Sequence, residues 1–305
     1  MRNHWDYLLM GELTNEEMEM LRSYLWQDSG GGDLTSILFN DQTATAVITA
    51  EEDCILSGLD EAAFIFEEEG CIVELMQGAF NDPYCESGSE VLMVSGPVSG
   101  MLKAERIALN VMSRMTGIAT RAHEASSVAE EANPGTRVAG TRKTTPGFGI
   151  FEKKALNHGG ALPHRRDLTS LAMLKDNHIA ALGGGPDAVL AGVEIIREKY
   201  GPYVLIEVEA EDLQTAIAAV EAGADILMLD NMSPKLLSSV VEKVRKEADE
   251  QGSEITIEAS GGINMEDISA FAPYVDVISM GALTCGVPIK SFRMDYHGQI
   301  ESVDE

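Results

Sequence analysis

The second half of the chain repeats one pattern, and this pattern restricts the possible folds more than any other feature. A short apolar run ends in a polar residue and is followed by a segment with helical periodicity. The apolar runs are "TRVAGTRK" (136–143), "LAMLKDNH" (171–178), "YVLIEVEA" (203–210), "DILMLDN" (225–231), "ITIEASGG" (255–262) and "VDVISMGA" (275–282). Such runs are typical of strands buried on both faces of a parallel sheet. Helical patterns between them, at 211–224 and 233–252 for example, predict an α/β barrel or a doubly wound sheet.

The residues that end these runs favour the barrel. They are mostly polar or charged: Arg142, Lys143, Lys175, Glu209, Asp230, Ser260 and Gly281. In barrel enzymes the active groups stand at the carboxyl ends of many different strands, whereas an open sheet gathers its ligands at one switch point. We therefore predict an α/β barrel whose active site lies at this end of the strands.

The first hundred residues follow a different pattern. Runs rich in β-formers, such as 44–59 and 89–102, flank a helix-like segment at 60–70, and together they indicate a small α/β sandwich. A long helical segment (102–132) leads from it into the barrel, and "NPG" after this segment is a stop signal. We predict a sandwich domain over 1–110 and a barrel over 111–284, with the tail 285–305 returning to the sandwich.

Composition and charge exclude several classes of function. The chain carries 22 Lys and Arg against 50 Asp and Glu, and its net charge of −28 argues against nucleic acid or an anionic membrane as a partner. It contains no apolar run of the roughly 18 residues that a transmembrane helix needs. Cys54, Cys71, Cys85 and Cys285 show no CxxC spacing, which argues against zinc and favours reduced thiols. Residues 1–17 lack a signal-peptide pattern, so the expected location is the cytoplasm.

Positive charge is concentrated between residues 137 and 178. This basic segment holds eight Lys or Arg and three acidic residues, a local charge of +5 in a strongly acidic chain. Arg142, Lys143, Arg165 and Lys175 follow or end strands rather than occupying helix faces. Arg binds carboxylates and phosphates through two hydrogen bonds, and Lys acts as a point charge. The segment therefore predicts a substrate with several anionic groups; a solvated basic surface with ion pairs is the alternative.

Glycine-rich turns and acidic residues follow the later strands. "SGGI" (260–263) and "GAL" (281–283) resemble the loops that hold a phosphate by backbone N–H groups after the last strands of a barrel. Glu209 and Asp230 end adjacent strands and could bind Mg²⁺ or sugar hydroxyls. The alternative is that these carboxylates serve only as ion-pair partners for the cations of the basic segment.

Several motifs occur together and in a fixed order. They are "TRKTTPG", "EKKAL", "HGG", "HR" and "KDNHI" within 141–179, with "GDLTS" (32–36), "AERIALNVMSRMTGIAT" (104–120), "IEVEAEDL" (206–213), "GADILMLDNM" (223–232), "IEASGGIN" (257–264) and "VDVISMGALT" (275–284). This set spans nearly the whole chain and resembles the quinolinate phosphoribosyltransferase family.

The resemblance implies a fold, a reaction and partners. The family has a small N-terminal α/β sandwich and a C-terminal seven-stranded α/β barrel, one strand more than the six runs above. Its members are pentosyltransferases that join quinolinate to phosphoribosyl pyrophosphate with Mg²⁺, and they release CO₂ and pyrophosphate to give nicotinate mononucleotide for NAD synthesis. They form homodimers in which one subunit's sandwich covers the other's barrel mouth, and some form hexamers.

The resemblance also implies roles for individual residues. Arg106 matches an arginine that reaches the neighbouring subunit's site and contacts a quinolinate carboxylate. Arg142, His164 and Arg165 match the carboxylate-binding group, and Lys143 and Lys175 match lysines near substrate and pyrophosphate. Glu209 and Asp230 match acids near the ribose and the metal. The loops that hold the 5′-phosphate are matched by Ser260, Gly261, Gly262 and Gly281.

Three positions depart from the family pattern, and other functions compete. Gly140 stands where Asp is common, Ala161 where a third Gly is frequent, and Cys285 where a polar residue is expected. These departures leave room for a nicotinate phosphoribosyltransferase or the paralogue of the molybdenum operon, although the intact "KDNH" favours the quinolinate enzyme. A Schiff-base aldolase that uses Lys175 is a remote alternative, and a non-catalytic binding module would not need cations and acids to converge.

Overall fold

The computed structural model describes residues 13–30, 32–39, 41–76 and 84–302 of the 305-residue chain. The chain divides into two compact units. Unit 1 runs to His123 and also includes Thr145–Gly160 and the chain from Gly286 onward, and unit 2 comprises Glu124–Thr144 and Ala161–Cys285. The expectation that no signal peptide is present concerns mainly residues outside the described ranges.

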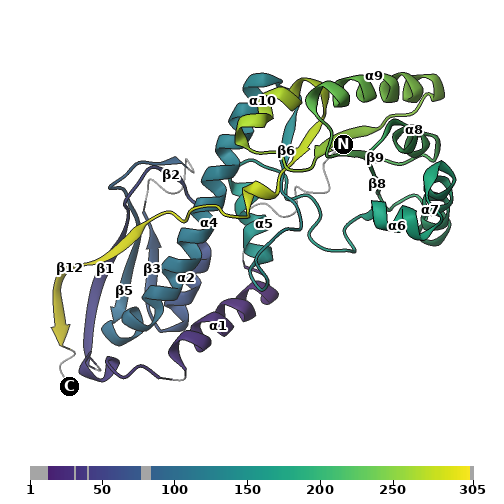
Figure 1. The fold of residues 1–305 in the computed structure, drawn as a ribbon. Helices are drawn as coiled ribbons and strands as arrows, with labels where there is room; N and C mark the ends of the chain where they lie inside the picture. The colour runs from purple at the N-terminus through teal and green to yellow at the C-terminus, as the bar shows by residue number, and fades with distance from the viewer. Residues whose placement is uncertain (1–12, 31, 40, 77–83, 303–305) are drawn as a thin grey trace. The chain divides into compact units, whose positions relative to one another are not determined.

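Unit 1 is built on a four-stranded antiparallel sheet in the order β12-β1-β5-β3 (Figure 1). Its strands are β1 (Gln42–Ala50), β3 (Ile72–Leu75), β5 (Glu90–Pro97) and β12 (Phe292–Ser302), beside a two-stranded ladder of β2 (Cys54–Ile55) and β4 (Tyr84–Cys85). Its helices are α1 (Asn15–Ser29), α2 (Leu59–Glu68), α5 (Gly149–His158) and the greater part of α4 (Val98–Ala132). The tail strand β12 pairs with β1, so the C-terminal segment lies in the same sheet as the N-terminal one.

The long helix α4 supplies a large part of the core of unit 1. Met101, Ala104, Ala108, Met112 and Met115 are fully buried, and their spacing of three and four residues places them on one face of the helix. The helix ends at Ala132, directly before "NPG", as the sequence predicted. Helix α1 was not predicted, although its capping box between Thr14 and Glu17 is a readable N-terminal signal.

Unit 2 contains a six-stranded parallel sheet in the order β6-β11-β10-β9-β8-β7. The strands are β6 (Arg137–Ala139), β7 (Ala172–Leu174), β8 (Ile206–Ala210), β9 (Ile226–Asp230), β10 (Thr256–Ser260) and β11 (Val277–Ser279). The helices are α6 (Asp176–Ala181), α7 (Gly185–Tyr200), α8 (Leu213–Glu221), α9 (Pro234–Gln251) and α10 (Ile268–Phe271). From β7 to β11 each strand pairs with the next one along the chain, and β11 pairs with the first strand, β6.

This strand order decides between the two predicted architectures. A doubly wound sheet reverses direction at a switch point, whereas the order here continues around and returns to the first strand, as in a barrel. The seventh position is reduced to one residue, because Leu162 forms an isolated parallel bridge with Ala139. The predicted fold class, a small N-terminal α/β sandwich with a C-terminal α/β barrel, is therefore confirmed.

The strands of unit 2 are shorter than the apolar runs that predicted them. The run 171–178, for example, contains only the three residues of β7, and helix α6 begins at Asp176. Consequently Arg142, Lys143 and Lys175 lie just beyond their strands. The predicted start of α9 is confirmed: the Ser233 hydroxyl accepts a hydrogen bond from Leu236 N–H, and Pro234 opens the first turn.

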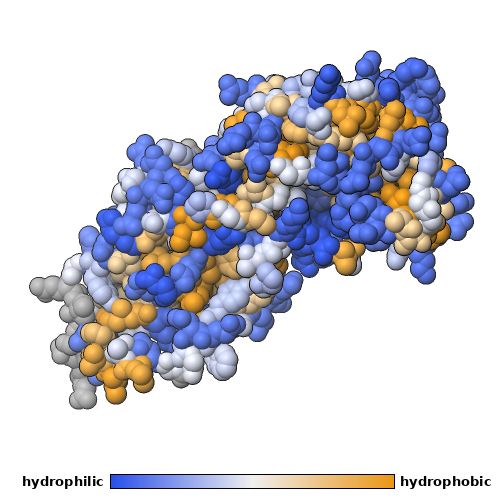
Figure 2. Space-filling model, viewed as in Figure 1, coloured by the Kyte–Doolittle hydropathy of each residue, from blue (hydrophilic) through white to orange (hydrophobic). Residues whose placement is uncertain are grey.

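The surface and the thiols agree with the composition. On the face shown in Figure 2, hydrophilic residues cover much of each unit, as expected for a net charge of −28. Among the described residues, no helix has both the length and the hydropathy to cross a bilayer. All four cysteines are free, and Cys54 lies opposite Cys85 in the β2–β4 ladder.

Candidate active site at the barrel mouth

The carboxyl ends of the parallel strands bring most of the predicted site residues to one end of unit 2. Arg142 and Lys143 follow β6, Lys175 follows β7, Glu209 lies in β8, Asp230 and Ser260 end β9 and β10, Gly261 and Gly262 follow β10, and Gly281 follows β11. His164 and Arg165 follow the bridge residue Leu162. We call this end of the strands the barrel mouth. Arg106 instead belongs to α4 in unit 1, where its side chain is 64% exposed and lies 3.7 Å from Glu105.

Three cations at the barrel mouth have no acidic partner. Within the described residues, the side chains of Arg142, Lys143 and Arg165 make no hydrogen bond or ion pair. Arg142 and Lys143 are exposed, whereas Arg165 is only 7% exposed. Burial, followed by the nearby charge of Arg142, lowers the pKa of Arg165. The charges of Glu207 and Glu209 act on Arg165 in the opposite sense. Among the described residues no carboxylate is bonded to the guanidinium of Arg142 or Arg165, so both groups can bind an anion from solution.

The fourth cation and the two predicted acids form a separate group. The Lys175 ammonium donates a hydrogen bond to the carboxylate of Glu209, which is buried while the lysine is partly exposed. Burial and the negative charge of Glu209 raise the pKa of Asp230, whose carboxylate accepts a hydrogen bond from the Asn231 amide at 2.5 Å. Among the described residues, direct ion pairing with the basic segment therefore accounts for one carboxylate, Glu209. The charge of Lys175 also acts on Asp230, without an ion pair between the two side chains.

The loop after β10 has a backbone that requires glycine at one position. Gly261 has φ +94°, and an added Cβ would lie 2.5 Å from the backbone nitrogen of Asn231. Asn231 itself adopts φ 58° and donates its N–H to the Ser260 carbonyl at 3.1 Å. Gly262 has open space around it, and an added Cβ at Gly281 would approach the Lys143 side chain to 3.0 Å. The turn is therefore closely packed at Gly261, whereas the backbone of Gly262 is open to an approaching ligand.

Sequence reasoning missed a buried polar cluster beneath the barrel mouth. Nε2 of His164 lies 3.3 Å from a Glu258 oxygen and 3.6 Å from a Glu207 oxygen. Glu207 is fully buried and Glu258 is 2% exposed, and burial followed by the charge of Glu258 raises the pKa of Glu207 to about 7. A signal was present, because side chains alternate along a strand and each glutamate stands two residues before a predicted site residue, Glu209 or Ser260.

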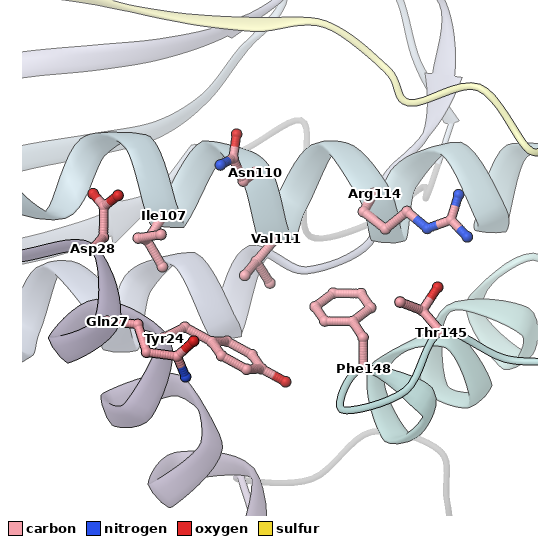
Figure 3. Close-up of a pocket in the computed structure, with 9 residues that line it drawn as sticks. All are labelled: Tyr24, Gln27, Asp28, Ile107, Asn110, Val111, Arg114, Thr145 and Phe148. Atoms are coloured by element: carbon pink, nitrogen blue, oxygen red, sulfur yellow. The ribbon is translucent and has the colours of Figure 1, made fainter.

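A cavity of about 500 Å³ lies in unit 1 and is unsuited to the expected substrates (Figure 3). It contains none of the predicted site residues; it is lined by Tyr24, Gln27, Asp28, Ile107, Asn110, Val111, Arg114, Thr145 and Phe148. Its one cation, Arg114, is already bound to Glu152 at 2.8 Å and to the Val287 carbonyl at 3.0 Å. Asp28 at its wall would repel a carboxylate, so the barrel mouth remains the candidate site.

Comparison with known protein families shows which family the chain belongs to. Residues 33–116 match the model of the quinolinate phosphoribosyl transferase N-terminal domain, and residues 118–295 match that of the C-terminal domain. The chain belongs to the quinolinate phosphoribosyl transferase family. The family predicted from the motifs is thereby confirmed.

Individual relatives are similar to this phosphoribosyl transferase over most of their lengths. The nicotinate-nucleotide pyrophosphorylase (carboxylating) of Homo sapiens is 37% identical over 278 residues, which cover 90% of each chain. The probable enzyme of the same name from Methanothermobacter thermautotrophicus is 34% identical over 284 residues, covering 92% of this chain and 99% of the relative. The crystal structure of NadC from Streptococcus pyogenes superposes with a TM-score of 0.83 at 31% identity, covering 97% of this chain and all of the other.

The three departures from the family motifs occupy defined places in this transferase. Gly140 donates its N–H to the Leu162 carbonyl at 2.8 Å and so belongs to the bridge that replaces the seventh strand. Ala161 is buried beside that bridge. Cys285 is exposed, and its sulfur lies 3.5 Å from the Lys143 carbonyl oxygen. None of these residues carries a charged side chain, and Gly140 places no carboxylate at the end of β6, where Asp would add a negative charge.

Proposed function

We propose that the protein transfers the phosphoribosyl group of phosphoribosyl pyrophosphate to quinolinate and releases pyrophosphate and CO₂, giving nicotinate mononucleotide for NAD synthesis. The observation that carries this proposal is the set of three unpaired cations at the barrel mouth of a quinolinate phosphoribosyl transferase. Arg142 and Arg165 would bind the carboxylates of quinolinate, with His164 beside them. Lys143 and Lys175 would face the pyrophosphate, and the backbone around Ser260, Gly261, Gly262 and Gly281 would hold the 5′-phosphate.

The proposed chemistry follows from the charges of the substrates. The pyridine nitrogen attacks C1 of the ribose while pyrophosphate leaves, so negative charge grows on the leaving group. Cations fixed beside it stabilise the transition state more than the ground state. The pyridinium then withdraws electrons from the adjacent carbon, which allows its carboxylate to leave as CO₂ and a proton to take its place. No covalent bond to the protein is needed in this sequence.

The acids at the barrel mouth fit a magnesium site. Glu209 and Asp230 offer carboxylate oxygens, the ligand type that Mg²⁺ prefers. Burial, followed by the negative charge of Glu209, raises the pKa of Asp230, and a cation bound between the two carboxylates would relieve their repulsion. We propose that Glu209 and Asp230 hold Mg²⁺ directly or through water and substrate hydroxyls. Bound there, the ion would neutralise charge on phosphoribosyl pyrophosphate.

Replacing Asp230 with Asn separates this role from simple charge balance. We expect weaker binding of phosphoribosyl pyrophosphate with less dependence on Mg²⁺, while quinolinate binding stays near normal, because the carboxylate serves the metal and the ribose. Calorimetric titration of each ligand separately measures both effects. If Asp230 only balanced nearby lysines, both anionic ligands would bind more tightly in the variant, and that result would refute the metal assignment.

An assay with two alternative acceptors tests the proposed function. Purified protein with phosphoribosyl pyrophosphate and Mg²⁺ should convert quinolinate far better than nicotinate, and CO₂ should appear in step with nicotinate mononucleotide. Nicotinate has one carboxylate and would leave a cation of the arginine pair unpaired, at a cost of roughly 1–3 kcal/mol. Equal or better use of nicotinate would instead favour a nicotinate phosphoribosyltransferase. The remote aldolase alternative is disfavoured, because the Lys175 amine is already engaged in a hydrogen bond to Glu209.

We also propose that the active unit is a homodimer with shared sites. Support comes from Arg106, whose largely exposed side chain has one ion pair within the described residues, a 3.7 Å contact with Glu105. An arginine in that position is available to a neighbouring subunit. A hexamer built from such dimers would leave this contact unchanged.

A further inference from the structure

Two glutamates inside the barrel have no role in the proposed function, and their burial is costly. Glu207 on β8 and Glu258 on β10 lie on either side of β9, and the two carboxylates and His164 Nε2 lie within 4.8 Å of one another. Among the described residues, both oxygens of Glu207 and one of Glu258 have no hydrogen-bond partner. Apolar residues of similar volume at such positions are often neutral or stabilising. Two buried, mutually repelling carboxylates therefore call for a functional explanation.

The imidazole of His164 connects these glutamates to Arg165. On one side Nε2 lies within ion-pair distance of both carboxylates. On the other side Nδ1 accepts a hydrogen bond from the Arg165 backbone N–H at 2.8 Å. His164 also adopts φ 55°, one of two non-glycine residues with positive φ in the described part of the chain. The ring thus stands between the carboxylates and a left-handed turn whose next residue is Arg165.

The direction of these contacts argues against a metal at this cluster. The carboxylates favour a charged ring: burial alone would lower the pKa of His164, but Glu258 and Glu207 outweigh it and raise the pKa. The Arg165 N–H instead favours a neutral ring that keeps the lone pair on Nδ1. In both forms Nε2 carries a proton and faces the carboxylates, so it has no lone pair for a metal ion.

We propose that Glu207 and Glu258 are positioning residues: they hold the Nε2–H side of His164, which fixes the left-handed turn that presents Arg165 at the barrel mouth. Arg165 needs such support, because its guanidinium is buried yet bonded to no residue of the described chain. A direct carboxylate partner would orient it equally well but would compete with the substrate. Acting through His164 orients the arginine and leaves its N–H groups for a ligand. This inference rests on the proposed binding of a quinolinate carboxylate by Arg165.

The test places at positions 207 and 258 either a side chain that can accept a hydrogen bond or one of similar size that cannot. The double variant Glu207→Met/Glu258→Met should raise KM for quinolinate by about 10- to 100-fold, the range for loss of a residue that orients a site ligand. The double variant Glu207→Gln/Glu258→Gln keeps carbonyl acceptors and should show a smaller rise. KM for phosphoribosyl pyrophosphate should stay unchanged in both. The melting temperature of the Met variant should fall further than that of the Gln variant, because the buried imidazole of His164 loses both nearby carboxylates and gains no polar group in their place.

A matched control and a spectroscopic readout complete the design. Met228 is buried and lies in register between Glu209 and Glu258, so Met228→Leu changes the packing beside the cluster but keeps every carboxylate and the imidazole. It should leave both KM values within about twofold. With ¹⁵N-labelled histidine, the wild-type protein should show a protonated Nε2 of His164, identified by its loss in His164→Gln. The Met variant should show this proton in fast exchange.

The outcomes separate this inference from the proposed function. A wild-type protein that does not turn over quinolinate contradicts the proposed function, and the nitrogen spectrum still reports on the cluster. An active wild type with an unchanged quinolinate KM in the Met variant contradicts the positioning role alone. An equal rise of both KM values, or an unprotonated Nε2 with bound metal in the purified protein, would also overturn it.

Discussion

Replacing Arg165 with Met should reduce kcat/KM for quinolinate by roughly 30-fold to several thousand-fold, which corresponds to the 2–5 kcal/mol typical of truncating one partner of a buried charge pair. The reason is its burial: Arg165 is 7% exposed as a residue, so a carboxylate bound to it is shielded from water. KM for phosphoribosyl pyrophosphate should change little. Steady-state kinetics with each substrate varied in turn measures the two effects.

The neighbouring residue provides the control for this substitution. Arg166 is exposed and pairs with Asp167 at 3.2 Å, so Arg166→Met removes the same charge from the same loop outside the proposed contact. Its kcat/KM should stay within about twofold of wild type, as for most surface substitutions. Similar losses in both variants would show that general loop charge, rather than a specific contact of Arg165, governs quinolinate binding.

Replacing Lys154 with Met should destabilise the protein by about 3–5 kcal/mol, the usual cost of breaking a buried ion pair by removing one partner. Lys154 Nζ lies 2.6 Å from Glu61 in unit 1, and the two side chains are 10% and 1% exposed. One Glu61 oxygen already has no hydrogen-bond partner, so the variant would leave a buried carboxylate with no compensating charge. Denaturant titration measures the loss of free energy of unfolding.

The pH dependence of that loss has a defined sign. Burial raises the pKa of Glu61 in the folded protein, and removal of Lys154 raises it further. A group with a raised folded-state pKa favours folding at low pH and loses this contribution as the pH rises through the folded-state value. The penalty in Lys154→Met should therefore shrink as the pH falls toward the acidic range. Adding Glu61→Gln to Lys154→Met should recover much of the free energy of unfolding at neutral pH. A loss of stability that depends neither on pH nor on the residue at position 61 would contradict this account.

The alternation of strands and helices was sufficient to predict the barrel, and the residues that follow its strands led to the candidate site. It succeeded because the strands of unit 2 lie in mostly apolar runs with a polar residue at or just beyond the strand end, such as Asp230 in β9 and Lys175 after β7. The seventh strand position could not be predicted, since a bridge of one residue at Leu162 has no periodicity to detect. The family motifs supplied candidate roles that charge and spacing alone left open.

The buried glutamates show the limit of reading strands as uniformly apolar. In "IEVEA" the alternation places Glu207 and Glu209 on one face of β8 and Ile206, Val208 and Ala210 on the other. The apolar character of the run predicted a buried strand, which is observed. It gave no indication that the face with the glutamates contacts His164, because that contact joins segments more than forty residues apart.

The unpaired cations of the barrel mouth belong to a chain with a net charge of −28, and this combination affects how substrates arrive. Far from the barrel mouth, an anionic substrate is repelled by the combined electrostatic field of the acidic residues in the rest of the chain. Within a few ångströms it meets Arg142, Lys143 and Arg165 and is attracted. Dissolved salt screens the long-range field first, since the Debye length is about 10 Å at 0.1 M ionic strength. Moderate salt should therefore speed the capture of substrate, the reverse of the usual effect for enzymes that steer charged ligands.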